Sequence, residues 1–363
     1  MEKRDYEIIL DDTEKIRAGD PANMYNKIFD LPEQMTKALK LAEVWKVGRE
    51  DFADVKNIVL IGMGGSAIGG DLARSLLSGK LVIPFTTCRH YALPEYVDDE
   101  TLVIASSYSG NTEEMLSALD DALQRKALIA AISTGGMLED VARINDIPLM
   151  KIPGGLQPRA AIGYSVVPLL MFFEKIGLAE GMGDAIKATI ERLAKDREKY
   201  IEDNATLSNP AKRLAGMIHG RIPIIYGGPP VTDVVALRWK GQFCENGKNL
   251  AYAGEFPEMT HNEYVGWSRA MEPLAEKLIA VFLRDAGDHP KIRRRMNIVK
   301  ETIDRLGVEV VDLHTMGERP LERMFSLIQW GDFISYYLAI LNGVDPTPVD
   351  AIESLKAQLM DVK

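Results

Sequence analysis

The segment TLVIASSYSGNTEE, residues 101–114, contains three elements in direct succession. Its apolar start, 101–105, is typical of a buried strand, and its two final glutamates are typical of the first turn of a helix. Four hydroxyl residues lie between them, namely Ser106, Ser107, Ser109 and Thr112. The segment therefore predicts a strand, a hydroxyl-rich turn and a helix.

The same succession of strand, turn and helix recurs along the chain. Short apolar runs that alternate with helical patterns predict parallel sheets covered by helices on both faces. The pattern stops near residue 180 and restarts near residue 206, so we expect an α/β fold with two αβα sandwich units rather than one large sheet. The strands that we expect are 57–62, 82–86, 102–106, 127–133 and 148–152 in the first unit, and 222–226, 278–284 and 308–312 in the second.

The length of 363 residues is typical of two domains of about 150 residues each. We expect a helical N-terminal arm over residues 1–50 and a first domain over 51–180. A charged connecting helix then spans 181–205, and a second domain with a C-terminal helix spans 206–363.

Composition excludes several classes of protein. The formal net charge of −10 argues against nucleic acid as a partner, because phosphate backbones need a positive surface. The acidic N-terminus is not a signal peptide, and the apolar run 166–173 is too short to span a bilayer. Only two cysteines occur, which fits a reducing compartment. We therefore expect a cytoplasmic protein without a membrane partner.

The five histidines and two cysteines show none of the spacings that are typical of a metal site. We expect neither a metal nor an organic cofactor.

Two loops of the first unit point to an anion. GMGGSAIGG, residues 62–70, and the hydroxyl-rich turn after residue 105 each follow a predicted strand and precede a predicted helix. In parallel α/β sheets such loops gather at one edge, where ligands bind. Backbone amides and the positive helix end favour a negative charge there, and hydroxyls add donors without adding charge. The two loops predict a site for one phosphate group.

Two other interpretations stay open on the residues alone. Gly62-x-Gly64-x-x-Ala67 also fits a loose dinucleotide fingerprint, although the next strand ends in Thr-Thr-Cys-Arg89 without the acid that a ribose needs. An arginine there would suit a 2′-phosphate. Alternatively, Thr112 and its neighbours simply cap a helix, but capping needs one hydroxyl and not four.

The two loops, followed by QPRAA at residues 157–161, resemble the SIS superfamily of sugar isomerases. More narrowly, they resemble the bifunctional phosphoglucose/phosphomannose isomerases of archaea and some bacteria, from about residue 20 to the end of the chain. The resemblance implies that Arg159 is the cation that stabilises an enediolate oxygen. It also implies that five residues hold the 6-phosphate of a sugar, namely Gly65, Ser66, Ser107, Ser109 and Thr112.

Glu245 is the candidate base. It lies at the end of the predicted helix 231–245, before the helix stop Asn246-Gly247. A glutamate at a helix end is usually solvated surface, but KGQFCENGKN resembles the family segment that bears the catalytic glutamate.

Two further residues take their expected roles from the resemblance. His261, in the loop segment PEMTHNE, would open the sugar ring from across the interface of a homodimer. Lys356 lies on a short amphipathic helix after Asp-Pro-Thr-Pro348 and would assist ring opening. On the residues alone, a loop histidine and a terminal lysine are more often solvated. Thr347 is the nearest candidate for the threonine with which the family makes room for both C2 epimers.

We therefore expect a metal-independent isomerase that interconverts glucose 6-phosphate and mannose 6-phosphate with fructose 6-phosphate through a cis-enediol. The alternatives are a phosphosugar sensor of SIS type without catalysis, a phosphoglucose isomerase of single specificity, and an aminosugar-phosphate isomerase.

Overall fold

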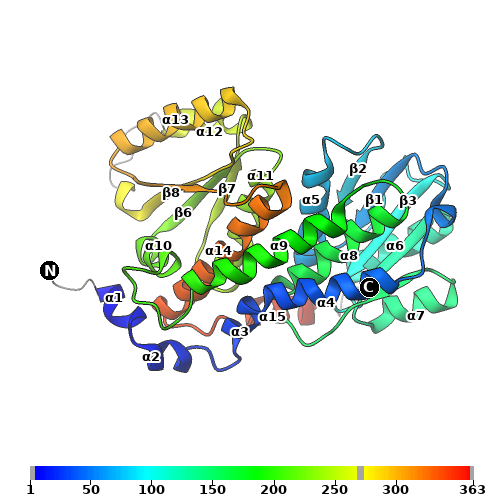
Figure 1. The fold of residues 1–363 in the computed structure, drawn as a ribbon, viewed down its shortest axis with the longest axis horizontal. Coiled ribbons are helices and arrows are strands. Elements are labelled where there is room, and N and C mark those ends of the chain that lie inside the picture. The colour runs from blue at the N-terminus through cyan, green and yellow to red at the C-terminus, as the bar shows by residue number, and fades with distance from the viewer. Residues whose placement is uncertain (1–4, 268–273, 360–363) are drawn as a thin grey trace.

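The computed structural model describes residues 5–267 and 274–359. Two α/β lobes lie at opposite ends of the molecule, with long helices between them (Figure 1). The expected architecture of two αβα units with a helical N-terminal arm is confirmed, and the arm consists of α1 to α4. The helices are α1 Asp5–Leu10, α2 Thr13–Ala18, α3 Met24–Phe29, α4 Leu31–Val44, α5 Gly64–Leu77, α6 Glu113–Gln124, α7 Gly136–Ile144, α8 Ile162–Lys175, α9 Met182–Asp196, α10 Pro210–Ile218, α11 Thr232–Glu245, α12 Glu263–Trp267, α13 Pro290–Arg305, α14 Pro320–Leu341 and α15 Asp350–Leu359.

The first sheet has five parallel strands in the order β2-β1-β3-β4-β5. Both of its faces are buried because alternate residues of each strand pack in different cores. Ile58 and Leu60 belong to the core that lies between the lobes, whereas Val59 and Ile61 pack against α6 and α7. The strands are β1 Asn57–Ile61, β2 Phe85–Cys88, β3 Thr101–Ser107, β4 Leu128–Ser133 and β5 Leu149–Lys151.

The second sheet repeats this plan with four parallel strands in the order β7-β6-β8-β9. Ile225 and Val281 belong to the same central core as the first sheet, and Tyr226 and Phe282 pack on the outer face under α13. The two sheets therefore share one core, which fixes how the lobes sit relative to each other. The strands are β6 Ile222–Gly227, β7 Tyr252–Glu255, β8 Leu278–Arg284 and β9 Glu309–His314.

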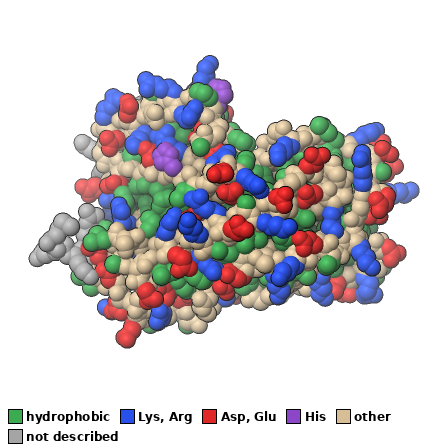
Figure 2. Space-filling view, in the orientation of Figure 1, with side chains coloured by type: hydrophobic (Ala, Val, Ile, Leu, Met, Phe, Trp, Pro, Cys, Tyr) green, Lys and Arg blue, Asp and Glu red, His purple; other side chains and the backbone are tan. Residues whose placement is uncertain are grey.

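Helix α14 fills the centre of this shared core. By length and composition it could cross a membrane, but 94% of its apolar 18-residue window is buried inside the protein. Such burial is typical of the core helix of a folded domain. On the face shown in Figure 2, acidic and basic side chains intermingle over most of the surface.

Two observed strands differ from those expected from the sequence. The expected strand 82–86 is observed at Phe85–Cys88, because Val82 is 94% exposed and the pairing with β1 begins only after Pro84. β7 was not expected at all. It is a four-residue edge strand, YAGE. Its first and last residues are exposed and its two middle residues are small, so the sequence shows no alternation of apolar and polar side chains.

The second sheet carries carboxylates where the first carries hydroxyls. In topology β8 corresponds to β3, and the turn after it contains Asp285 and Asp288, which are 4% and 3% exposed. Asp285 accepts hydrogen bonds from Arg323 Nε at 2.8 Å and Thr315 Oγ1 at 2.8 Å. Asp288 accepts one from the Asp285 amide at 2.9 Å, while its Oδ1 has no partner among the described residues. This turn would therefore repel an anion.

Burial raises the pKa of Asp288 to about 6, and this predicts a pH effect on stability. As pH rises from about 4 to about 6, the unfolded chain loses this proton before the folded protein does, so Asp288 lowers the free energy of unfolding. We expect Asp288→Asn to raise that free energy by about 2 kcal/mol at about pH 8, with the gain shrinking as the pH falls through about 5. Urea titrations across this range would measure it.

Asp285→Asn is the matched variant in the same turn and should act in the opposite direction. It gives up charge-assisted hydrogen bonds to Arg323, so we expect a loss of about 1–3 kcal/mol. If Asp288→Asn also lowered the free energy of unfolding at about pH 8, burial of the Asp288 carboxylate would not be what destabilises the wild-type protein.

Candidate active site

The two glycine- and serine-rich loops follow β1 and β3, neighbouring strands whose connections leave in opposite directions across the sheet. Ligands bind at such a switch point in open α/β sheets. Gly62 and Gly65 let the first loop approach closely, since a β-carbon at Gly62 would lie 2.6 Å from the Ser106 carbonyl oxygen. A β-carbon at Gly65 would lie 2.6 Å from the Pro158 carbonyl oxygen. The first loop therefore touches both the second loop and the QPRAA segment.

Hydroxyls tie the two loops into one cup. The Tyr108 amide donates to Ser66 Oγ at 3.2 Å, which joins α5 to the turn after β3. The Gly110 amide donates to Ser107 Oγ at 3.0 Å, and Ser107 Oγ lies 2.8 Å from Thr112 Oγ1. Thr112 occupies the N-cap of α6 but makes no side-chain capping bond. Helix capping therefore does not account for these hydroxyls.

Ser109 completes the cup at its exposed rim, where its Oγ accepts from the Asn111 amide at 3.2 Å. The five residues expected to hold a phosphate thus lie on the first turn of α5 and on the adjoining segment from the end of β3 to the N-cap of α6. Below we call Gly65, Ser66, Ser107, Ser109 and Thr112 the hydroxyl cup.

Arg159 lies beside the cup with only 4% of its surface exposed. Tyr108 holds the segment that leads to it, because its hydroxyl donates to the Pro153 carbonyl at 3.0 Å and accepts from the Leu156 amide at 3.1 Å. Burial lowers the pKa of the Arg159 guanidinium, and the carboxylate of Glu245 opposes that shift.

Glu245 ends α11 and reaches toward this arginine. Arg159 Nη1 lies 3.4 Å from Glu245 Oε2, although the two residues are 86 positions apart in sequence and come from different lobes. The side chain of Glu245 remains 34% exposed. A carboxylate and a guanidinium therefore meet at an accessible place, where one can take a proton and the other can steady a negative oxygen.

A cavity of about 210 Å³ separates this pair from the glycine loop. One wall is formed by Gly64 and Gly65, and Arg159, Gln242 and Glu245 line the other side. A second cavity, of about 510 Å³, lies between Glu245 and the start of α15. Glu245 borders both cavities.

His261 and Lys356 are not brought to this site within one chain. His261 ends the short 3-10 helix Glu258–His261 and is exposed, and Lys356 is exposed on α15. Neither side chain lines the two cavities next to Glu245. Thr347 is closer, since its carbonyl accepts from Arg159, but its Oγ1 is buried without a partner among the described residues.

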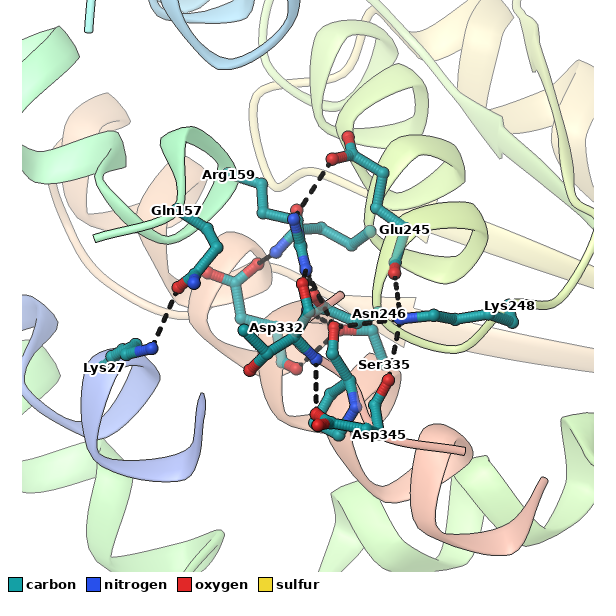
Figure 3. A network of polar contacts seen from close by, with 12 residues as sticks. Lys27, Gln157, Arg159, Glu245, Asn246, Lys248, Asp332, Ser335 and Asp345 are labelled. Atoms are coloured by element: carbon teal, nitrogen blue, oxygen red, sulfur yellow. Dashed lines mark hydrogen bonds and ion pairs between the residues drawn. The ribbon is translucent and has the colours of Figure 1, made fainter. Parts of the chain in front are cut away.

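Sequence reasoning missed the residues that hold Arg159 in place (Figure 3). Asn246 Oδ1 accepts from Arg159 Nε at 2.5 Å, and Arg238 donates to the Arg159 carbonyl at 3.1 Å while it pairs with Asp332. The motif CENGK contained Asn246 next to the candidate base, but adjacency alone does not indicate a contact.

Two lysines near the site were also missed. Lys27 on α3 donates to Gln157 Oε1 at 3.0 Å, so the N-terminal arm reaches the QPRAA segment. Lys248 donates to the carbonyls of Glu245, Asp345 and Pro346 at 2.9, 2.8 and 3.1 Å. Burial, followed by the charge of Arg159, lowers the pKa of Lys248. Because an ammonium has three donors, Lys248 has none left for a substrate.

Within residues 5–267 and 274–359, no group of three or more His, Cys, Asp or Glu side chains is placed to hold a metal ion.

Two family models and solved structures match the fold of this chain. The SIS domain family matches residues 51–173, and the family described as the bacterial phospho-glucose isomerase C-terminal SIS domain matches residues 207–359. The crystal structure of a hypothetical protein from Thermus thermophilus superposes with a TM-score of 0.76 at 18% identity, covering 97% of this chain and 94% of that one. That likeness shows the fold alone.

Curated relatives show the family. The bifunctional phosphoglucose/phosphomannose isomerase of Caldicellulosiruptor bescii is 45% identical over 94% of this chain and 100% of the relative. The protein of the same description from Aquifex aeolicus is 34% identical over 87% of this chain and 94% of its own length. The expectation drawn from the motifs is therefore confirmed, and the chain belongs to the bifunctional phosphoglucose/phosphomannose isomerase family.

Proposed function

We propose that this protein interconverts glucose 6-phosphate and mannose 6-phosphate with fructose 6-phosphate, with Glu245 as the base. One observation carries the proposal: the Glu245 carboxylate pairs with Arg159 at 3.4 Å, and both line a small cavity together with Gly65 of the hydroxyl cup. A substrate with its phosphate in the cup would place its reacting carbons toward that pair. Membership of the family supports the same assignment.

The hydroxyl cup would bind the 6-phosphate without a charged side chain. Amides at the start of α5 and the hydroxyls of Ser66, Ser107, Ser109 and Thr112 supply the donors.

The chemical step moves one proton between neighbouring carbons. Glu245 takes the proton from C2 of the open-chain aldose, and the electron pair shifts to the carbonyl oxygen at C1 to form the cis-enediol. Arg159 Nη1 stabilises the negative oxygen on C1. The proton of the C2 hydroxyl passes to that oxygen, the ketose carbonyl forms at C2, and Glu245 returns its proton to C1. Both C2 epimers react if the enediol can be reprotonated on either face, and Thr347 is our candidate for making that room.

Ring opening completes the proposal. We assign it to His261 of the partner copy in a homodimer, together with Lys356. The exposure of His261, and its absence from the walls of both cavities beside Glu245, support a role outside its own chain's site. The two cysteines, Cys88 and Cys244, are both free thiols, which fits the cytoplasmic placement that we propose.

The test is turnover of fructose 6-phosphate by the full chain, with EDTA present and with the two aldose phosphates assayed separately. We expect both products. Glucose 6-phosphate alone would narrow the function to a single isomerase and remove the role of Thr347. If neither forms while fructose 6-phosphate still raises the melting temperature, the protein is a phosphosugar sensor rather than an enzyme.

A further inference from the structure

We propose that Asn246 is a positioning residue that holds Arg159 so that one guanidinium N–H stays free for the substrate. The inference rests on the function proposed above. It concerns a residue that makes no contact with the substrate and acts only through Arg159 (Figure 3).

The side chain of Asn246 is fixed at both ends. It is 0% exposed, its Oδ1 accepts from Arg159 Nε at 2.5 Å, and its Nδ2 donates to Ser335 Oγ at 3.0 Å. Ser335 in turn donates to the Asp332 carbonyl at 2.7 Å on α14. Because Nε of an arginine can only donate, the oxygen end of the amide must face Arg159.

A count of the N–H donors of Arg159 shows how many remain free for a substrate. An arginine has five N–H groups. In Arg159, Nε is taken by Asn246, and Nη2 donates to the carbonyls of Pro346 at 2.8 Å and Thr347 at 2.7 Å. Nη1 makes one long contact, to Glu245 at 3.4 Å. The remaining N–H on Nη1 has no partner among the described residues, so a substrate oxygen beside Glu245 would find one free donor.

The contacts of Nη2 with the two carbonyls do not by themselves prevent the guanidinium from rotating. With Nη2 held and Nε released, the planar group can pivot about Nη2 and swing Nη1 away from Glu245. The Asn246 contact removes that freedom because it fixes a second corner of the plane. Lys248 secures the carbonyl side, since it donates to Asp345 and Pro346.

The position of Asn246 in the chain adds to its effect. It directly follows Glu245 and is the C-cap of α11, and its own amide donates to Gln242. Glu245 and Asn246 therefore lie at the same helix end. Because Asn246 holds Arg159, the local backbone geometry sets the distance between the Glu245 carboxylate and the Arg159 guanidinium. A misplacement of about 1 Å at such a pair can cost about 100-fold in rate.

The experiment is a double-mutant cycle on fructose 6-phosphate turnover with Asn246→Ala, Arg159→Lys and the double variant. A lysine lacks Nε, so it cannot use Asn246 in the same way. We expect Asn246→Ala to lower kcat by about 10- to 100-fold and Arg159→Lys by about 100- to 1,000-fold. KM should stay within about threefold in Asn246→Ala, because the hydroxyl cup holds the phosphate.

The kcat of the double variant decides between the two outcomes. If Asn246 acts only through Arg159, the double variant matches Arg159→Lys within about threefold. Multiplication of the two single effects would overturn the inference, because it would mean a role independent of Arg159. An unchanged kcat in folded Asn246→Ala would overturn it as well.

Asn249→Ala is the matched control, since Asn249 lies three positions on and donates to the carbonyls of Arg221 and Leu250 instead. It should keep kcat within about twofold. If Asn246→Ala does not fold, Asn246→Leu takes its place in the cycle, because it keeps nearly the same volume and removes the oxygen to which Arg159 Nε donates. Absence of turnover in the wild-type protein would refute the proposed function itself, and the inference with it, whereas a multiplicative cycle refutes the inference alone.

Discussion

Glu245→Gln should reduce isomerisation of fructose 6-phosphate to both aldose phosphates by at least about 1,000-fold in kcat. The amide cannot accept the proton from the substrate carbon, and in the proposed mechanism that proton has no other route. Glutamine keeps the length of the side chain and an oxygen for Arg159 Nη1, so the fold should not change. The measurement is coupled turnover in both directions, together with loss of tritium from C2 of labelled glucose 6-phosphate.

Substrate binding should survive this substitution. The hydroxyl cup is untouched, so fructose 6-phosphate should raise the melting temperature of Glu245→Gln about as much as that of the wild type. Glu191→Gln, an exposed glutamate on α9, is the matched control and should retain full turnover. Persistent turnover in Glu245→Gln would move the base elsewhere, while loss of both turnover and binding would point to damage of the fold.

A mixed dimer should recover activity from two inactive variants. We expect Glu245→Gln and His261→Ala each to lose about 100-fold or more as homodimers. If His261 serves the partner's site, the dimer of one copy of each contains one site with both defects and one intact site. Its turnover should then be about half that of the wild-type dimer.

The two variants would be co-expressed with different tags, and the mixed dimer purified through both. Mixed dimers of Glu245→Gln with a second, differently tagged Glu245→Gln copy are the control and should stay inactive. If Glu245 and His261 of the same chain formed one site, every site in the mixed dimer would carry one defect and no activity would return. Purification of monomers alone would remove the basis for a shared site.

The strands, the helices and the glycine- and serine-rich loops were accessible from the sequence because their signals are local. Runs such as 58–61 and 102–105 are apolar on both faces, which is typical of a parallel sheet that helices cover on both sides. Glycines and hydroxyls directly after such strands mark the edge where helix amides are free. β7 escaped notice because a short edge strand of small residues has no such pattern.

The expected site residues fall into two groups, those that meet within one chain and those that do not. Motif resemblance indicated Arg159, Glu245 and the hydroxyl cup. In the folded chain Arg159 and Glu245 line one cavity together with Gly65 of the cup. The assignments of His261 and Lys356, like the three domain boundaries, stay predictions. Both side chains are exposed, and a single chain does not contain the contacts that would test them.

The sequence by itself determined the two-unit α/β fold, the place of the glycine- and serine-rich loops and the family, since each depends on residues close together in the chain. Only the tertiary structure decided the order of the strands, the single core shared by both sheets, and the meeting of Arg159 with Glu245 across 86 positions. It alone also identified Asn246 and Lys248 as the residues that fix this pair and its carbonyl support. Hydrogen bonds between remote residues depend on how helices and loops pack, and spacing along the chain does not record that packing.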